Sequence, residues 1–292
     1  MKKLLFIINP KAGVKKNKHY IDEALEVFKN AGYKVGIRYT RKRADGTNLA
    51  RSYGGDVDLV VCMGGDGTLN EVMQGLLEEG IDTPLGYIPA GSTNDFAASL
   101  GLKTNPKEQA QFIVSHSPRP LDLGRFNGRY FVYTASAGIF TKTSYSTPQE
   151  LKNRLGHFAY ILTGIRELFH IRRLKLKIQT DQETFRGSYL FVAINNATKV
   201  GGIMKLDEEL VQFNDGVFEL MLVESPKGFV ELTKLAFKVL TQKYTGKITL
   251  KQIKSARIVD SSDIDWSLDG EKEKGKETIK FKVIHDAVHF IY

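Results

Sequence analysis

The sequence predicts an α/β domain built on a doubly wound parallel sheet, followed by a β-rich, sandwich-like domain. Two observations carry this prediction. Over residues 4–100, short apolar runs alternate with segments of helical period and are separated by glycine-rich turns, which is typical of a parallel sheet covered by helices on both faces. Beyond 118–120, most apolar runs have the character of strands instead. We therefore place the domain boundary there, with domains over 1–122 and 123–285.

The first four elements follow from local patterns. Residues 4–8 are a continuous apolar run, as expected for a strand buried on both faces. Residues 17–31 carry apolar side chains at helical spacing and end at a glycine. A second strand follows at 33–40. A short helix at 45–53 is closed by a glycine pair at 54–55.

The next four elements repeat this alternation. Residues 59–63 form another unbroken apolar run, which predicts a strand buried on both faces. Helical period resumes over 68–78. A fourth strand is expected at 85–88, and a short helix at 96–100 is closed by Gly101.

The second domain is predicted to be mostly strands. Paired strands are expected within 126–137, joined near Asn127 and Gly128. Amphipathic helices are expected at 156–171 and 228–243. The remaining runs read as strands, at 174–180, 185–193, 217–223, 257–268 and 278–292.

Composition sets outer limits on function. The chain has 292 residues, with 42 Lys and Arg against 33 Asp and Glu, so its formal net charge is +9. A hydrophobic fraction of 42% excludes a disordered chain. The single cysteine, Cys62, excludes an internal disulfide framework and a cysteine-based zinc site, so we expect a cytoplasmic protein. No stretch approaches the roughly 20 apolar residues of a membrane span.

The most informative segment is the glycine-rich turn Gly64-Gly65-Asp66-Gly67 between a predicted buried strand and a helix. Glycines at the carboxyl end of a parallel strand let backbone N–H groups approach a phosphate, and the helix N-terminus adds a favourable dipole. A bare carboxylate at Asp66 would repel phosphate, so it should hold a metal ion, a water or a hydroxyl. A simple turn with Asp66 or Thr68 as N-cap is the alternative.

Two further loops occupy equivalent positions. Pro89-Ala-Gly-Ser-Thr-Asn-Asp95 leaves the fourth strand, and Asn9-Pro10-Lys11-Ala12-Gly13 leaves the first. Loops at the carboxyl ends of strands in a doubly wound sheet converge on one crevice. The small hydroxyl and amide side chains suit phosphate or metal contact, and they suit helix capping equally well.

Acidic turns in the second domain are ambiguous. Asp269-Gly270-Glu271 is a standard hairpin pair followed by an acid, so it reads either as a plain turn or as two acids beside a crevice, one acting as a general base. Asp215, followed by Gly216, poses the same choice.

These motifs together resemble the diacylglycerol kinase catalytic family of bacterial soluble lipid kinases, which is related to sphingosine and ceramide kinases and more distantly to NAD kinases. Asn9-Pro10-x-x-Gly13 resembles the family's first-loop motif, and residues 64–72 match its signature without a mismatch. Residues 89–97 resemble its P-x-G-T-x-N-D-F-A motif, with Ser92 keeping the hydroxyl of the usual Thr. The similarity covers nearly the whole chain.

The resemblance implies a site in the cleft between the domains. It implies ATP bound by Asn9, Pro10, Lys11, Ala12, Gly13, Thr40, Gly65, Asp66, Gly67, Thr68, Leu69, Asn70, Glu71 and Ser92. It also implies a catalytic Mg²⁺ organised by Asp66 and Asp95, with Asp269 as the general base and Glu271 as the alternative. A final strand over 286–292 would return to the first domain.

A second, structural Mg²⁺ is implied at Asp215, with Gln212 and Val217 supplying backbone oxygens. Here the chain departs from the family, which usually has Leu-x-Pro-x-Ala before this aspartate and often a second acid beside it. This chain has Asn214 in the neighbouring position. We therefore expect the second site to be absent or weaker by one charge.

The implied activity is transfer of the γ-phosphoryl group of ATP to diacylglycerol, giving phosphatidic acid. Another lipid alcohol, such as a sphingoid base or phosphatidylglycerol, and a non-catalytic nucleotide-binding regulator are the alternatives. We expect transient docking at the anionic inner membrane surface through basic residues in 151–177, unless these charges are merely solvated. A homodimer is left open. Nucleic acid is not an expected partner, because no nucleic-acid-binding motif is present.

Overall fold

A computed structural model describes residues 1–12, 18–92, 94–139, 173–200, 204–206, 211–259 and 263–292. The chain forms two compact units. The first unit contains 1–123, 213–216 and 284–292, and the second contains 124–212 and 217–283. Among the described residues, no helix combines the length and the apolar character needed to cross a membrane.

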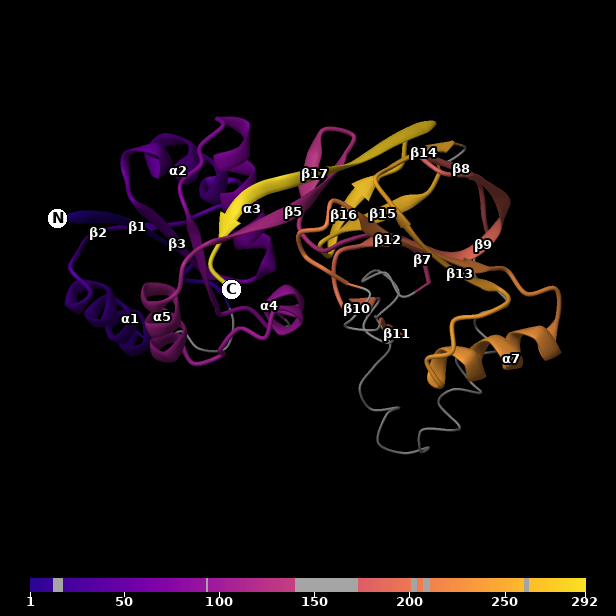
Figure 1. Ribbon diagram of the computed structural model, residues 1–292, viewed down its shortest axis with the longest axis horizontal. Helices are drawn as coiled ribbons and strands as arrows, with labels where there is room; N and C mark the ends of the chain where they lie inside the picture. Colours follow the sequence, from indigo (N-terminus) through magenta and orange to yellow (C-terminus); the bar gives the residue numbers. More distant parts are fainter. Residues whose placement is uncertain (13–17, 93, 140–172, 201–203, 207–210, 260–262) are drawn as a thin grey trace. The chain divides into compact units, whose positions relative to one another are not determined.

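The first unit is the predicted α/β structure (Figure 1). Its strands β2, β1, β3 and β4 lie side by side in that order and are all parallel, and Phe290 near the end of β17 adds a parallel pair to Leu85. Its elements are β1 (Lys2–Ile8), α1 (Lys18–Asn30), β2 (Tyr33–Tyr39), α2 (Asp45–Tyr53), a 3-10 turn (Gly54–Asp56), β3 (Leu59–Gly64), α3 (Asp66–Glu78), β4 (Leu85–Pro89), α4 (Asp95–Ser99) and α5 (Pro106–Ser115). All eight elements predicted for this part are present.

Helices cover both faces of the parallel sheet. Helix α1 packs beside α5, and α2 packs beside α3 (Figure 1). Leu4, Phe6 and Ile8 alternate along β1 and join Phe28 of α1 and Ile113 of α5 in one core cluster. Every residue of β3 and β4 is buried, as the unbroken apolar pattern of β3 indicates. The carboxyl ends of these strands are thus held by a rigid support.

The second unit consists mostly of antiparallel strands. Neighbours follow the order β16, β15, β7, β9, β8, β14 and β17, while β12 pairs with β9 and β13. The elements are β5 (Arg119–Phe126, which begins in the first unit), β6 (Arg129–Phe131), β7 (Thr134–Gly138), β8 (Leu174–Thr180), β9 (Thr184–Asn195), β10 (Lys199–Val200), β11 (Met204–Lys205), β12 (Phe218–Glu224), α7 (Phe229–Leu240), β13 (Ile248–Ile253), β14 (Ser255–Val259), β15 (Asp265–Leu268), β16 (Glu271–Lys274) and β17 (Thr278–Phe290, which ends in the first unit).

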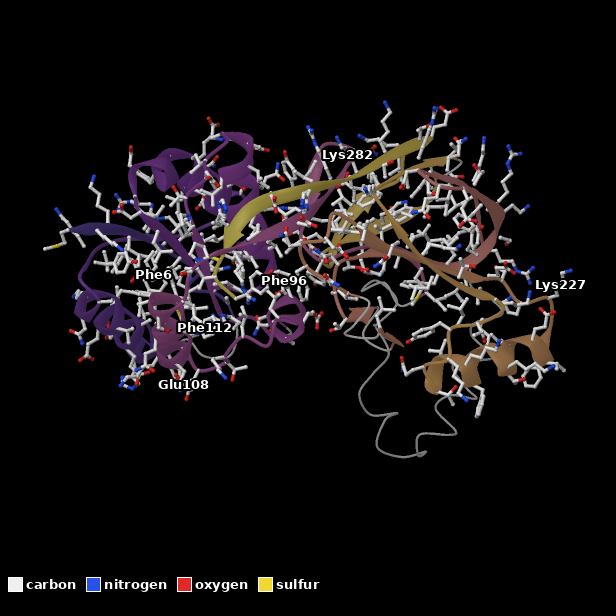
Figure 2. All side chains as sticks on the ribbon, viewed as in Figure 1. Phe6, Phe96, Glu108, Phe112, Lys227 and Lys282 are labelled. Atoms are coloured by element: carbon white, nitrogen blue, oxygen red, sulfur yellow. The ribbon has the colours of Figure 1, made fainter. Side chains whose placement is uncertain are left out.

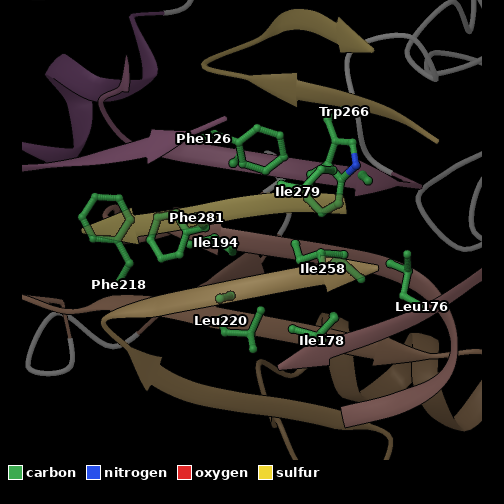
Figure 3. Close-up of a cluster of buried hydrophobic side chains, with 14 of the residues drawn as sticks. Phe126, Leu176, Ile178, Ile194, Phe218, Leu220, Ile258, Trp266, Ile279 and Phe281 are labelled. Atoms are coloured by element: carbon green, nitrogen blue, oxygen red, sulfur yellow. The ribbon is translucent and has the colours of Figure 1, made fainter. Parts of the chain in front are cut away.

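A large apolar cluster lies among the described strands of this unit. Figure 3 shows Trp266 and Phe126 packed together, and Phe218 beside Phe281. The α/β plus β-rich fold class is therefore confirmed. Two details differ from the prediction or cannot be compared with it. The single strand expected at 257–268 is two strands, β14 and β15, and the helix expected at 156–171 lies outside the described residues.

Gly75 provides a test of the packing between α2 and α3. A Cβ atom at this position would lie 2.3 Å from the backbone oxygen of Thr47 and 3.0 Å from the Cβ of Ala50. Alanine usually stabilises a helix relative to glycine, but here we expect Gly75→Ala to destabilise the protein by about 1–3 kcal/mol. Thermal unfolding would show a melting temperature lower by several degrees.

Gly55→Ala is the matched control. The nearest atom to a Cβ there is in the flexible side chain of Ile81, at 3.8 Å. Its melting temperature should stay close to that of the parent protein. A Gly75→Ala protein that melts at a higher temperature than the parent would contradict this packing.

Candidate functional site

The glycine-rich turn joins the buried strand β3 to helix α3. A Cβ at Gly64 would lie 2.6 Å from Oγ1 of Thr68, so only glycine lets the first helical turn fold back so closely on the strand. Gly65 is the N-cap, and its carbonyl accepts hydrogen bonds from the backbone N–H groups of Thr68 and Leu69. The result is a helix N-terminus held directly at a strand end, which is a geometry that favours anions.

The loop after β1 contacts this turn. The Nδ2 atom of Asn9 donates to Oγ1 of Thr68 at 3.0 Å, and its backbone N–H donates to the carbonyl of Met63. Its Oδ1 accepts from the backbone of Lys11, which leaves the exposed Lys11 side chain near the loop. Pro10 and Ala12 belong to the same turn, and Gly13 lies outside the described residues.

The loop after β4 contacts the turn from the other side. A Cβ at Gly91 would lie 2.7 Å from the Cα of Gly65, so the two backbones touch. Asn94 holds this loop in shape, since its side chain exchanges hydrogen bonds with both the N–H and the carbonyl of Gly91, at 2.8 and 2.9 Å. The structure therefore brings together the three loops that the sequence singles out.

Asp66 and Asp95 meet where these loops touch. The backbone N–H of Asp95 donates to Oδ2 of Asp66 at 3.0 Å, and the Asp66 side chain is buried. Each aspartate is the first residue of a helix, α3 and α4 respectively. Both residues carry a carboxylate, the kind of hard oxygen ligand that Mg²⁺ prefers. The donor set fits that ion.

Other predicted nucleotide contacts have different surroundings. Thr40 is buried, and its N–H donates to Ile8 at the end of β1. The Leu69 side chain lies in the core, so only its backbone can face a ligand. Ser92 is exposed. The two carboxylate oxygens of Glu71 accept hydrogen bonds from the backbone N–H groups of Ala44 and Gly46, at 2.8 and 3.0 Å. It therefore braces the start of α2.

A buried acid that the sequence reasoning did not select lies in β5. Asp122 is fully buried, and its carboxylate accepts hydrogen bonds from the N–H of Gly216 at 2.6 Å, the N–H of Asp286 at 2.9 Å and Nδ1 of His285 at 2.8 Å. Its own N–H donates to the carbonyl of Phe213. These bonds hold 213–216 in the first unit, whereas the sequence placed that segment in the second domain.

The Asp122 cluster bears on the second metal site. Ligand atoms of Asp122, His285 and Asp286 all lie within 4.8 Å of one another, a spacing that a metal could use. The hydrogen bonds that the Asp122 carboxylate accepts are enough to explain why it can be buried without a metal ion. Of the predicted ligands, Asp215 belongs to the first unit with Asp122, whereas Gln212 and Val217 belong to the second.

The Asp269-Gly270 turn lies in the second unit and has the hairpin geometry. Both residues have positive φ, 49° and 83°, as a two-residue turn between β15 and β16 requires. The Asp269 carboxylate points inward and accepts from three successive backbone N–H groups, those of Val132, Tyr133 and Thr134, at 2.7, 3.0 and 3.1 Å. Its first structural role is thus to fix the segment that leads into β7.

Glu271 has a different environment from Asp269. It is partly exposed, at the start of β16, and forms an ion pair with Arg129. The same guanidinium also pairs with Glu273 at 3.1 Å. Glu271 is thus held beside Arg129 at a partly exposed position, whereas Asp269 is buried.

His285 is the titratable member of the Asp122 cluster. The hydrogen bond to Asp122 and the charge of that carboxylate raise the pKa of His285 above its ordinary value near 6.5; desolvation opposes this, and the charges of Asp286 and Asp215 add to it. A raised pKa in the folded state means that the stabilisation is fully present below about pH 6.5 and is lost as the pH rises through the folded value.

We therefore expect the melting temperature of His285→Gln to fall further below that of the parent at about pH 6 than at about pH 9. The control is His289→Gln, which removes an imidazole that lies 2.7 Å from the exposed carboxylate of Asp82 in the same unit. A gap between parent and His285→Gln that does not shrink with rising pH would refute the role of the charged imidazole.

Comparison with known proteins gives a consistent result. Residues 3–126 match the family model for the diacylglycerol kinase catalytic domain. A diacylglycerol kinase of Bacillus subtilis (strain 168) is 33% identical over 278 residues, which is 93% of this chain and 90% of that protein. A diacylglycerol kinase of Staphylococcus saprophyticus is 32% identical over 92% of this chain and 89% of its own length.

Structural similarity extends equally far. A crystal structure from Bacillus anthracis strain Sterne, described as a diacylglycerol kinase, matches with a TM-score of 0.83 and 26% identity, covering 100% of this chain and 95% of that one. The resemblance inferred from the loop motifs is thereby confirmed. Similarity of this extent to named relatives, over nearly the whole chain, means that the protein belongs to the diacylglycerol kinase family.

Proposed function

We propose that the protein transfers the γ-phosphoryl group of ATP to the free hydroxyl of diacylglycerol, giving phosphatidic acid in a reaction that depends on Mg²⁺. Membership of the family makes the protein a lipid kinase that uses ATP. Diacylglycerol is the acceptor named for its relatives. The observation that carries the proposal is the contact of three strand-end loops around Asp66 and Asp95.

The triphosphate is proposed to lie against these loops. Residues 65–71 are proposed to line the phosphates, with the backbone N–H groups of 65–67 as donors, because those of Thr68 and Leu69 already donate to the carbonyl of Gly65. The helix dipole adds to their attraction. Lys11 supplies a positive charge from the loop after β1, and Ser92 a hydroxyl from the loop after β4. The remaining proposed contacts are Asn9, Pro10, Ala12, Gly13 and Thr40.

Asp66 and Asp95 are the residues that would hold the magnesium ion. Bound there, Mg²⁺ would neutralise part of the charge on the phosphates during transfer. Burial of Asp66 and the hydrogen bond from the N–H of Asp95 fix the direction of its carboxylate before any ion arrives. A second Mg²⁺ ion is also proposed, held by Asp215 with Gln212 and Val217. This site has one acid fewer than is usual in the family, because Asn214 stands beside Asp215.

The acceptor hydroxyl needs a base, and we favour Glu271 over Asp269. Three backbone donors bind the Asp269 carboxylate, and the residue is buried, so a substrate hydroxyl has little access to it. Glu271 pairs with Arg129 and is partly exposed, and this exposure gives a substrate hydroxyl access. Asp269 would then act as a positioning residue for the same hairpin.

The substrate also implies where the enzyme works. A diacylglycerol hydroxyl lies at the headgroup level of a bilayer, so the protein is proposed to act at the anionic inner surface of the membrane. Of the basic residues singled out in 151–177, the structure describes Arg173, Lys175 and Lys177. Arg173, just before β8, and Lys175 are exposed, and Lys177 is half-buried. The others lie outside the described residues.

Transfer of radiolabelled phosphate from ATP tests the proposed reaction. The acceptors are diacylglycerol, a sphingoid base and phosphatidylglycerol in mixed micelles, each with and without added Mg²⁺. We expect label in phosphatidic acid, with diacylglycerol preferred, and loss of transfer when the metal is chelated. Labelling of a different lipid would replace the acceptor. ATP binding without any transfer would support a regulator instead of a kinase.

Glu271→Gln tests the base, with Glu273→Gln as the matched control. Each substitution removes one of the two carboxylates that pair with Arg129, so structural effects should be similar. We expect Glu271→Gln to lower kcat by roughly a hundredfold to ten-thousandfold, and Glu273→Gln to change it little. Similar kcat values for the two variants would exclude Glu271 from the role.

Asp269→Asn separates positioning from catalysis. An amide would turn a hydrogen-bond donor toward backbone N–H groups, so we expect a loss of about 1–3 kcal/mol in the free energy of unfolding. A variant with unchanged stability but abolished turnover would identify Asp269, and not Glu271, as the base.

A further inference from the structure

Helix α7 of the second unit exposes large apolar side chains. Phe229, Val230 and Phe237 are 56%, 64% and 66% exposed. In the part of the chain that the structure describes, the other exposed large apolar side chains are Met1, Tyr39 and Tyr53, which are scattered over the first unit. Single exposed apolar residues are ordinary, but three on one 12-residue helix indicate an interaction surface.

The patch is held firmly on its unit. Leu232, Leu235 and Val239 recur at helical spacing and are at most 8% exposed, so they form the inward face of α7. At 100° per residue, Val230 and Phe237 lie on the opposite side of the helix from these three. Figure 1 shows α7 lying outside the antiparallel strands of its unit. Helix α7 is therefore apolar on two faces, and among the described residues only one of them is buried in the core.

Positive charges border the exposed face. Lys227 lies at the N-terminal end of α7 (Figure 2), and Lys234 and Lys243 are also exposed. The acid on the helix, Glu231, is neutralised locally, because it accepts from the N–H of Lys227 at 2.7 Å and pairs with the ammonium of Lys247 at 3.4 Å. The helix thus combines apolar tips with an excess of lysines, which is the pattern of helices that lie in an anionic lipid interface.

We propose that the outward face of α7 inserts into an anionic lipid surface. This inference rests on the proposed function only in its purpose, namely bringing the enzyme to a membrane-held substrate. Charge argues for lipid over a second copy of the chain. A symmetric dimer through this face would bring two lysine-rich faces together, whereas anionic headgroups attract each lysine near the surface. The proposed insertion gives Phe237 a direct contact with acyl chains.

Fluorescence of Phe237→Trp tests this contact. The native chain has one tryptophan, Trp266, which is 1% exposed and lies in the core of the second unit. The new indole should be quenched by vesicles of phosphatidylglycerol and phosphatidylcholine whose acyl chains carry bromine, while Trp266 gives a constant background. The control, Tyr53→Trp, places an indole at an exposed aromatic position of the first unit, and we expect no quenching there.

Binding measurements complete the test. Replacing both Val230 and Phe237 by Ser should weaken co-sedimentation with these vesicles by about tenfold or more, given the transfer free energy of two large apolar side chains. Tyr53→Ser should bind like the parent. Lys234→Gln with Lys243→Gln should weaken binding to anionic vesicles and leave binding to neutral vesicles unchanged.

The outcomes separate this inference from the proposed reaction. Phosphorylation of a short-chain diacylglycerol dissolved as monomers should be unchanged by the Val230 and Phe237 substitutions. A parent protein that phosphorylates neither dissolved nor vesicle-borne diacylglycerol would overturn the reaction, while the quenching result still decides the docking. Vesicle binding without quenching of the Phe237→Trp indole would overturn the docking face. The docking face would also be overturned if, without vesicles, the Phe237→Trp emission shifted with protein concentration and the measured mass in solution were that of a dimer.

Discussion

The close approach of two backbone turns is the constraint on which the candidate site depends. Gly65 and Gly91 follow neighbouring parallel strands, and a side chain at Gly91 would have no room, since its Cβ would lie 2.7 Å from the Cα of Gly65. This approach brings the N–H of Asp95 onto the carboxylate of Asp66, and so makes one site from two loops. A parallel sheet supplies such a meeting point for any loop sequence, but only glycines allow the turns to touch. The contact between Asp66 and Asp95 thus depends on the close packing of the two loops.

Among the described residues, Glu71, Asp122 and Asp269 are three of the acids that accept two or more hydrogen bonds from backbone N–H groups. Glu71 braces the start of α2, Asp122 joins β5 to 213–216 and β17, and Asp269 fixes the segment before β7. Each carboxylate supplies the hydrogen-bond acceptor that these backbone N–H groups would otherwise find in a helix or a sheet. Glu271 pairs with Arg129 and is partly exposed, and this exposure is what distinguishes the proposed base from these acids that hold the chain in place.

The sequence predicted the first unit well because its signals are local. Unbroken apolar runs mark β1 and β3, and strand ends in a parallel sheet must converge, so the loops could be placed together in advance. Helix α5 was missed although its signal was present: Asn105 caps it and Pro106 is its first residue. Asp122 could have been noticed as an acid inside an apolar run. The role of Asp269 could not, because its partner Val132 lies 137 positions away along the chain.

The path of β17 has a consequence for synthesis of the protein. Residues 284–292 complete the sheet of the first unit, where the N–H of Ile291 donates to the carbonyl of Leu85 and Arg119 bonds to the carbonyl of Tyr292. While the ribosome makes the intervening residues, the outer edge of β4 has no strand to cover it. The edge of β4 in the nascent α/β unit therefore stays unpaired until the last strand emerges from the ribosome. During this interval a chaperone or a non-native strand could bind to that edge.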